Sequence, residues 1–61
     1  MWTLIWIIVT PNLDGTYEFT ATSEPFADFA TCAEKLAEKE AELRQAEKQG
    51  MAYTIECEEQ Q

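Results

Sequence analysis

The first strand predicted from the sequence is apolar at almost every position. Residues 2–9 read WTLIWIIV, a run of β-branched and aromatic residues that favours a β-strand. One alternating set contains Trp2, Leu4, Trp6 and Ile8, and the other contains Ile5, Ile7 and Val9 with Thr3. A strand that is apolar on both sides is normally covered on both sides. We therefore expect a partner to cover whichever side the chain itself leaves open.

Three further elements follow. Residues 11–15 (PNLDG) form a turn, in which Asp-Gly supplies the positive φ that a hairpin needs. Residues 17–22 alternate between apolar and polar side chains, as a half-covered strand does. A helix is predicted over residues 29–49, and a second alternating strand over residues 51–58.

The helix boundaries have sequence signals of their own. Ser23-Glu24-Pro25 is expected to end the second strand. Ser23 or Asp28 can cap the helix N-terminus, and we favour Asp28. Gly50 stands where a left-handed residue closes a helix.

The predicted helix has an apolar stripe and a charged surface. The stripe comprises Phe29, Cys32, Ala33, Leu36, Leu43 and Ala46. Glu40 falls near its centre, so either the stripe is uncovered there or Glu40 reaches out to solvent or a partner. The charged surface predicts three weak ion pairs, Lys35–Glu38, Lys39–Glu42 and Glu40–Arg44.

These elements assemble into one α+β domain over residues 1–61 with the order ββαβ. The most apolar strand is expected at the centre of a three-stranded antiparallel sheet of order 2-1-3, with the helix on one face. The side chains expected under the helix are one set of the first strand together with Tyr17, Phe19, Tyr53 and Ile55.

The other face of this sheet is the predicted interface. We expect it to carry Trp2, Leu4, Trp6 and Ile8, flanked by Glu18, Thr20, Thr54 and Glu56. A shift of one residue would exchange the two sets, leaving Ile5, Ile7 and Val9 outside instead. In both arrangements an apolar stripe faces outwards and predicts a partner, and we expect a homodimer that forms through this face.

Two cysteines, Cys32 and Cys57, lie on the inward sides of their elements. The helix and the return strand bring them to a similar level, so a disulfide is within reach. A core disulfide and buried free thiols both remain open, and the second would hold in a reducing cytosol. With no histidine and no close cysteine pair, we expect neither a metal site nor a cofactor.

The chain is strongly acidic, and its charged residues are unevenly distributed along the sequence. The net charge is −8, and all four bases lie in the helix region. Seven acids outside residues 29–49 have no neighbouring base: Asp14, Glu18, Glu24, Asp28, Glu56, Glu58 and Glu59. This pattern disfavours direct nucleic-acid binding and favours a basic protein partner, although charge also keeps a small domain soluble. Residues 1–9 are too short to span a membrane and resemble no secretory leader, so we expect a cytoplasmic protein.

No catalytic arrangement is evident. A hydrolytic triad needs a base such as histidine, and the chain has none. Phosphate-binding glycine loops are also missing, since there are only two glycines. The sequence therefore predicts a protein that is not an enzyme.

The segments FADFATC (26–32) and YTIEC (53–57), separated by a charged helix, resemble those of small orphan proteins of phages and prophages. The resemblance implies an inhibitor of host machinery, including anti-defence types, that acts by stoichiometric binding. Some such proteins present carboxylates in place of nucleic-acid phosphates. The alternatives are an assembly subunit that docks through its apolar sheet face, and a designed mini-protein.

Overall fold

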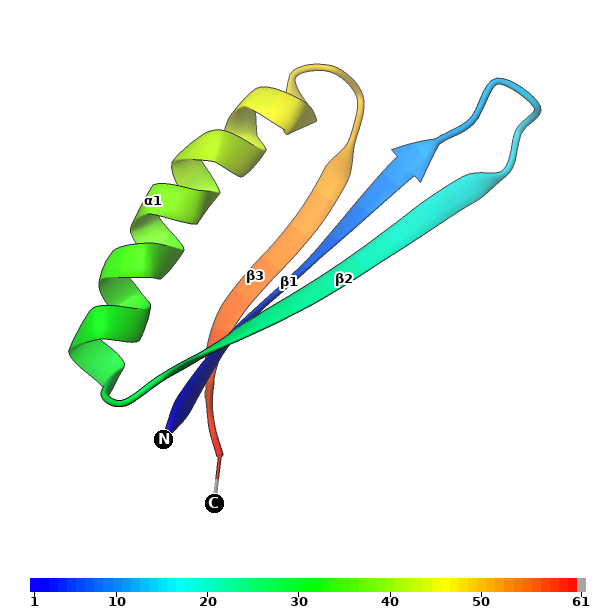
Figure 1. The fold of residues 1–61 in the computed structure, drawn as a ribbon. Helices are drawn as coiled ribbons and strands as arrows, with labels where there is room; N and C mark the ends of the chain where they lie inside the picture. Colours follow the sequence, from blue (N-terminus) through cyan, green and yellow to red (C-terminus); the bar gives the residue numbers. More distant parts are fainter. Residues whose placement is uncertain (61) are drawn as a thin grey trace.

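A computed structural model describes residues 1–60 (Figure 1). The elements are β1 (Trp2–Pro11), β2 (Tyr17–Phe26), α1 (Phe29–Glu47) and β3 (Ala52–Glu59). The three strands form an antiparallel sheet of order β2-β1-β3, and α1 packs on one face, mainly over β3. The predicted α+β fold, with order 2-1-3 and one covering helix, is confirmed.

A five-residue loop closes the β1–β2 hairpin. The backbone N–H of Asn12 donates to the carbonyl of Thr16 at 2.8 Å, and Gly15 turns the chain at φ 89°. Asp14 accepts from both the hydroxyl and the backbone N–H of Thr16. Both hydrogen bonds lower the pKa of Asp14, and the one from the Thr16 hydroxyl has the larger effect. The loop fixes the register, in which Pro11 lies opposite Tyr17.

β2 is longer than predicted, because it continues through Ser23, Glu24 and Pro25 to Phe26. Pro25 was expected to end the strand, and that prediction is wrong. β2 is an edge strand, and proline is tolerated on an edge because its missing N–H need not face a neighbouring strand. The extension carries the hairpin along the whole of β1, pairing Trp2 with Phe26.

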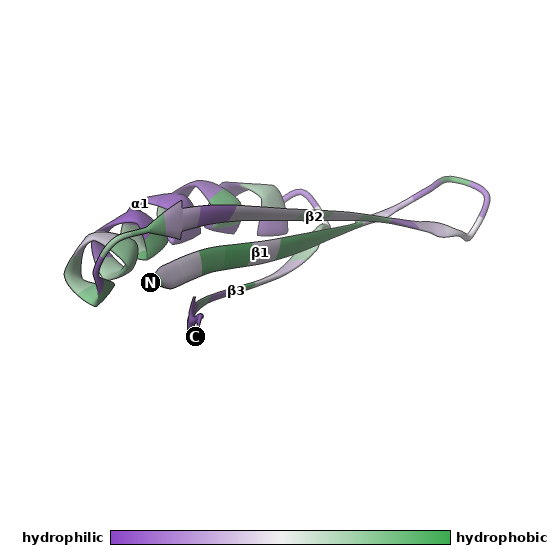
Figure 2. Cartoon of the chain, turned by 60° about the horizontal axis from the view of Figure 1, so that its bottom comes forward, coloured by the Kyte–Doolittle hydropathy of each residue, from purple (hydrophilic) through white to green (hydrophobic). Residues whose placement is uncertain are grey.

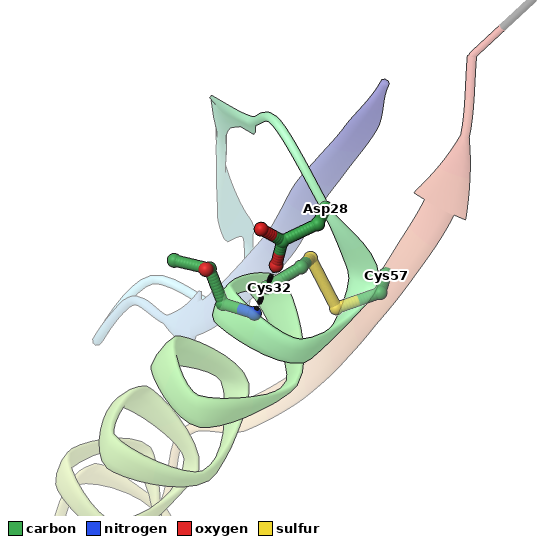
Figure 3. Close-up of a disulfide and its surroundings, with 4 residues drawn as sticks. Asp28, Cys32 and Cys57 are labelled. Atoms are coloured by element: carbon green, nitrogen blue, oxygen red, sulfur yellow. Dashed lines mark hydrogen bonds between the residues drawn. A yellow bond between two sulfur atoms is a disulfide. The ribbon is translucent and has the colours of Figure 1, made fainter.

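The helix begins where predicted. The Asp28 carboxylate accepts a hydrogen bond from the backbone N–H of Thr31 at 2.8 Å (Figure 3), and this bond lowers the pKa of Asp28. At the other end, Gly50 has φ 95°, and the N–H of Met51 reaches back to the carbonyl of Ala46. This pattern closes a helix at a left-handed glycine, and α1 ends two residues before the predicted Gln49.

The three predicted ion pairs on the exposed helix surface are present: Lys35–Glu38 at 3.3 Å, Lys39–Glu42 at 2.8 Å and Arg44–Glu40 at 3.6 Å. Glu40, which interrupts the apolar stripe, is half-buried and turns towards Arg44. Exposed pairs of this kind contribute little to stability.

The core is small. Among the described residues, the buried apolar side chains are Leu4, Cys32 and Leu43. Cys32 and Cys57 are joined by a disulfide with 6.2 Å between their Cα atoms (Figure 3), which is the first of the two alternatives that the sequence left open. The bond ties the first turn of α1 to β3 opposite Leu4, so it holds the helix to the sheet beside the most deeply buried side chains.

We predict that removing this bond destabilises the protein severely. The bond closes a loop over a sequence separation of 25 residues, and its loss should lower the free energy of unfolding by about 3 kcal/mol. Urea unfolding of the C32A/C57A variant and of the reduced wild-type protein should both show this loss. Equal unfolding curves for the oxidised and reduced protein would contradict the stabilising role.

The Asp28 cap predicts a pH-dependent contribution to stability. Because folding lowers the pKa of Asp28, the contribution is complete above the ordinary pKa of an aspartic acid and disappears as the pH falls through the lower value of the folded protein. At neutral pH, D28A should lower the Tm by about 5 °C, and the gap should narrow near pH 2. D28N is the control: its amide oxygen still accepts the hydrogen bond and does not titrate. A D28A gap that is the same at every pH would refute the assignment.

Candidate functional site: the uncovered face of the sheet

The helix covers the tryptophan-containing side of β1. Leu4 is 1% exposed, and the ring of Trp2 lies 4.7 Å from that of Phe29, centroid to centroid. The Lys39 ammonium lies 5.1 Å from the centroid of the Trp6 ring. The prediction that Trp2, Leu4, Trp6 and Ile8 lie on the uncovered face is therefore wrong. The alternative arrangement, with the tryptophans inside, is the one observed.

The reason lies in the disulfide. Cys57 pairs with Leu4 across the sheet, so its bond to Cys32 turns this set of β1 side chains towards the helix. Trp2 and Trp6 belong to the same set and are half-buried beneath α1, where they contact Phe29 and Lys39.

The opposite side of the sheet, which we call the open face, has no covering element (Figure 2). Its centre is a stripe of aliphatic side chains on β1, namely Ile5, Ile7 and Val9. The paired β2 residues that share this face include Tyr17, Phe19 and Ala21, and the paired β3 residues are Ala52, Thr54, Glu56 and Glu58. Phe19 is 73% exposed and Tyr17 63% exposed, which is unusual for large apolar side chains without a partner.

The sequence placed only part of this face correctly. Thr54 and Glu56 lie on it as predicted, and Tyr53 and Ile55 lie under the helix as predicted. Glu18 and Thr20 instead point to the helix side of β2, and Tyr17 and Phe19 point to the open face. The signal that could have found the two aromatics is the hairpin loop, since five loop residues pair Val9 with Phe19 and put both on one face.

The open face is asymmetric. Its β2 side, towards the hairpin loop, carries the aromatic rings of Tyr17 and Phe19. Its β3 side carries Glu56 opposite Ile5 and Glu58 opposite Thr3, at the other end of β1. Every base of the chain lies in α1 or just after it, so the charges on the open face are all negative. The face is therefore an apolar stripe with an acidic border along one side.

The hairpin extends past the helix, as Figures 1 and 2 both show. The radius of gyration is 13.0 Å, against about 10.5 Å for a compact chain of this length. The loop residue Leu13 is fully exposed at the tip. The far half of the hairpin therefore presents its apolar side chains without support from the helix.

The unopposed acids do not gather on one surface. Glu18, Glu24 and Glu59 lie on the helix side of the sheet, and Glu56 and Glu58 lie on the open face. Asp14 and Asp28 are engaged in the loop and the helix cap. This distribution lacks the single row of carboxylates that would imitate a phosphate backbone.

A groove between α1 and β2 lies over Leu4 and is lined by Glu24, Lys35, Glu38, Lys39 and Glu42. Its lining carries both signs of charge, and two of its ion pairs, Lys35–Glu38 and Lys39–Glu42, are formed within α1. Among residues 1–60, no group of three potential metal-ligating side chains comes together. No helix in that part of the chain is long and apolar enough to cross a membrane.

Comparisons of the chain with models of protein families, with curated proteins and with solved structures found no match.

The assignment of the two faces can be tested by stability measurements. L4A removes a fully buried side chain beneath the helix and should lower the free energy of unfolding by about 3 kcal/mol. I7A removes a half-buried side chain from the open face and should cost less than half as much. Urea unfolding of both variants measures this difference. Equal losses would contradict the difference in burial, and a larger loss in I7A would show that the faces are reversed.

Proposed function

We propose that this chain is a non-catalytic binding protein that acts by stoichiometric association through its open face. The observation that carries the proposal is the uncovered stripe of Ile5, Ile7 and Val9 on the central strand, extended by the exposed ring of Phe19. Contiguous apolar surface on a small soluble domain normally marks an interface. Aromatic side chains such as Phe19 and Tyr17 are typical anchors of such interfaces.

The acidic border specifies the kind of partner. A partner that covers the open face must lie beside Glu56 and Glu58, with no base of this chain to oppose them. A basic protein satisfies these acids and is attracted by the net charge of −8. A second copy would bring its own Glu56 and Glu58 and another net charge of −8, so a homodimer is the less favoured occupant.

We take the partner to be a protein of the host cell, as the resemblance to small phage proteins implies. In that setting the chain inhibits a host protein, such as a defence component, by occupying its surface. We base this proposal on the apolar stripe rather than on nucleic-acid mimicry, because the unopposed acids are spread over both faces. An assembly subunit that docks through the same face is the second candidate, and the same stripe supports it.

The cellular compartment is part of the proposal. The sequence favours the cytoplasm, whereas disulfides such as Cys32–Cys57 persist mainly in oxidising compartments. Thiol alkylation of the protein in intact host cells, followed by mass spectrometry, separates the two cases. Rapid alkylation of both cysteines places the protein in a reducing compartment, and resistance places it in an oxidising one.

The binding role is tested by comparing capture by matched variants. The wild-type protein, immobilised, is incubated with an extract of the natural host, and captured proteins are quantified by mass spectrometry. We expect I7K and F19S to lose at least nine-tenths of the specific partner. F19S is informative because Phe19 is largely exposed, so its loss leaves the core intact.

L13S is the matched control, since Leu13 is also a large exposed apolar residue but lies in the loop outside the open face. It should retain the partner. Circular dichroism and disulfide content show whether each variant is folded. Equal capture by the wild type, I7K and F19S would refute a binding role for the open face. Light scattering of the purified protein adds the oligomeric state: a 14 kDa species, twice the 7.0 kDa chain, would make a second copy the occupant.

A further inference from the structure

The dimensions of the open face indicate what shape of partner covers it. Apolar side chains occupy β1 and β2, whereas the β3 side carries Thr54, Glu56 and Glu58. With neighbouring strands about 4.8 Å apart, the apolar surface is only about two strands, or 10 Å, wide. A second sheet would bury side chains across all three strands, including the acids. A single α-helix, about 10 Å in diameter, fits the available width.

The spacing of the acids provides an independent observation. Glu56 and Glu58 project from the same side of β3 two residues apart, which corresponds to about 6.8 Å along a strand. Residues i and i+4 on one side of a helix are about 6 Å apart along its axis. Two bases at this spacing on a helix aligned with β3 would each face one glutamate.

The apolar stripe on β1 also has a spacing that matches one side of a helix. Ile5, Ile7 and Val9 succeed one another at the same two-residue interval along β1. Apolar residues at i, i+4 and i+8 of a helix would therefore lie over them in turn. The chain uses a similar arrangement on its covered face, where Cys32, Leu36 and Leu43 of α1 project towards the sheet. One helix on each face would complete a three-layer arrangement.

We propose that the open face binds an amphipathic α-helix of a partner protein, whose apolar stripe lies along Ile5, Ile7 and Val9 and whose flank carries Lys or Arg at i and i+4 opposite Glu56 and Glu58. This inference rests on the proposed binding function and names the class of partner for the same site. The bases lie towards the Thr3 end of β1, and the bulkiest apolar residues lie towards Phe19.

The test uses three synthetic helical peptides of equal length and apolar stripe. The first carries lysines at i and i+4 on one flank. The second has the same composition, with the two lysines moved to the side opposite the stripe. The third carries glutamates in place of the lysines of the first. Binding to the wild-type protein is measured by calorimetry, and the site is located by NMR shifts of the Ile5, Ile7 and Val9 signals.

We expect the first peptide to bind at least tenfold more tightly than the other two, with shifts confined to the open face. E56K/E58K should lose this preference and bind the third peptide instead. E34K/E47K is the matched control: it changes the net charge equally, on the exposed side of α1, and should change the affinity for the first peptide less than twofold. Such a charge exchange separates a specific contact from general attraction to an acidic protein.

Two results would overturn the inference. Equal binding of the first and second peptides would show that the position of the bases does not matter. Equal weakening by E56K/E58K and E34K/E47K would show attraction by net charge alone. Failure of the binding function itself is recognised separately, because I7K and F19S would then capture host proteins as well as the wild type does. A third result would also overturn the inference: if those variants lose capture while no peptide binds, the open face is an interface for something other than a basic helix.

Discussion

The covalent link between α1 and β3 is the constraint on which the rest of the structure depends. Cys57 lies opposite Leu4 on the central strand, so its bond to Cys32 decides which side of β1 is turned towards the helix. Once that choice is made, both tryptophans must lie beneath α1, and the isoleucines must face outwards. A core with so few buried side chains would not enforce this choice strongly by packing alone.

Much of the fold could be read from the sequence because local signals agree with one another. Asp28, Gly50 and the alternation in β3 each mark an element boundary by a local mechanism, namely a side-chain cap, a left-handed residue and a two-residue period. The residues that form the open face were harder to predict from the sequence. Both sets of β1 side chains are apolar, so periodicity could not say which set the helix covers. That choice depends on contacts between residues distant in sequence, such as Trp2 with Phe29.

The two faces of the sheet differ in how far their apolar side chains are covered. On the covered side, the packing of α1 is supplemented by indole rings and a disulfide. On the open side, half-buried aliphatic side chains and two exposed aromatics have no covering element. The single helix packs on one face of the sheet and leaves the other bare. The acids beside that bare surface determine what can approach it.

Both outer strands of this sheet have an unpaired backbone edge, and such an edge can recruit further strands into aggregates. β2 carries Glu18 near one end, with Glu24 and Pro25 near the other, and β3 ends in consecutive glutamates. If two copies paired edge to edge, like charges would repel each other and Pro25 could not donate a backbone hydrogen bond. The acids at the edges therefore disfavour the growth of fibrils. Association is thereby restricted to contacts between side chains on a face.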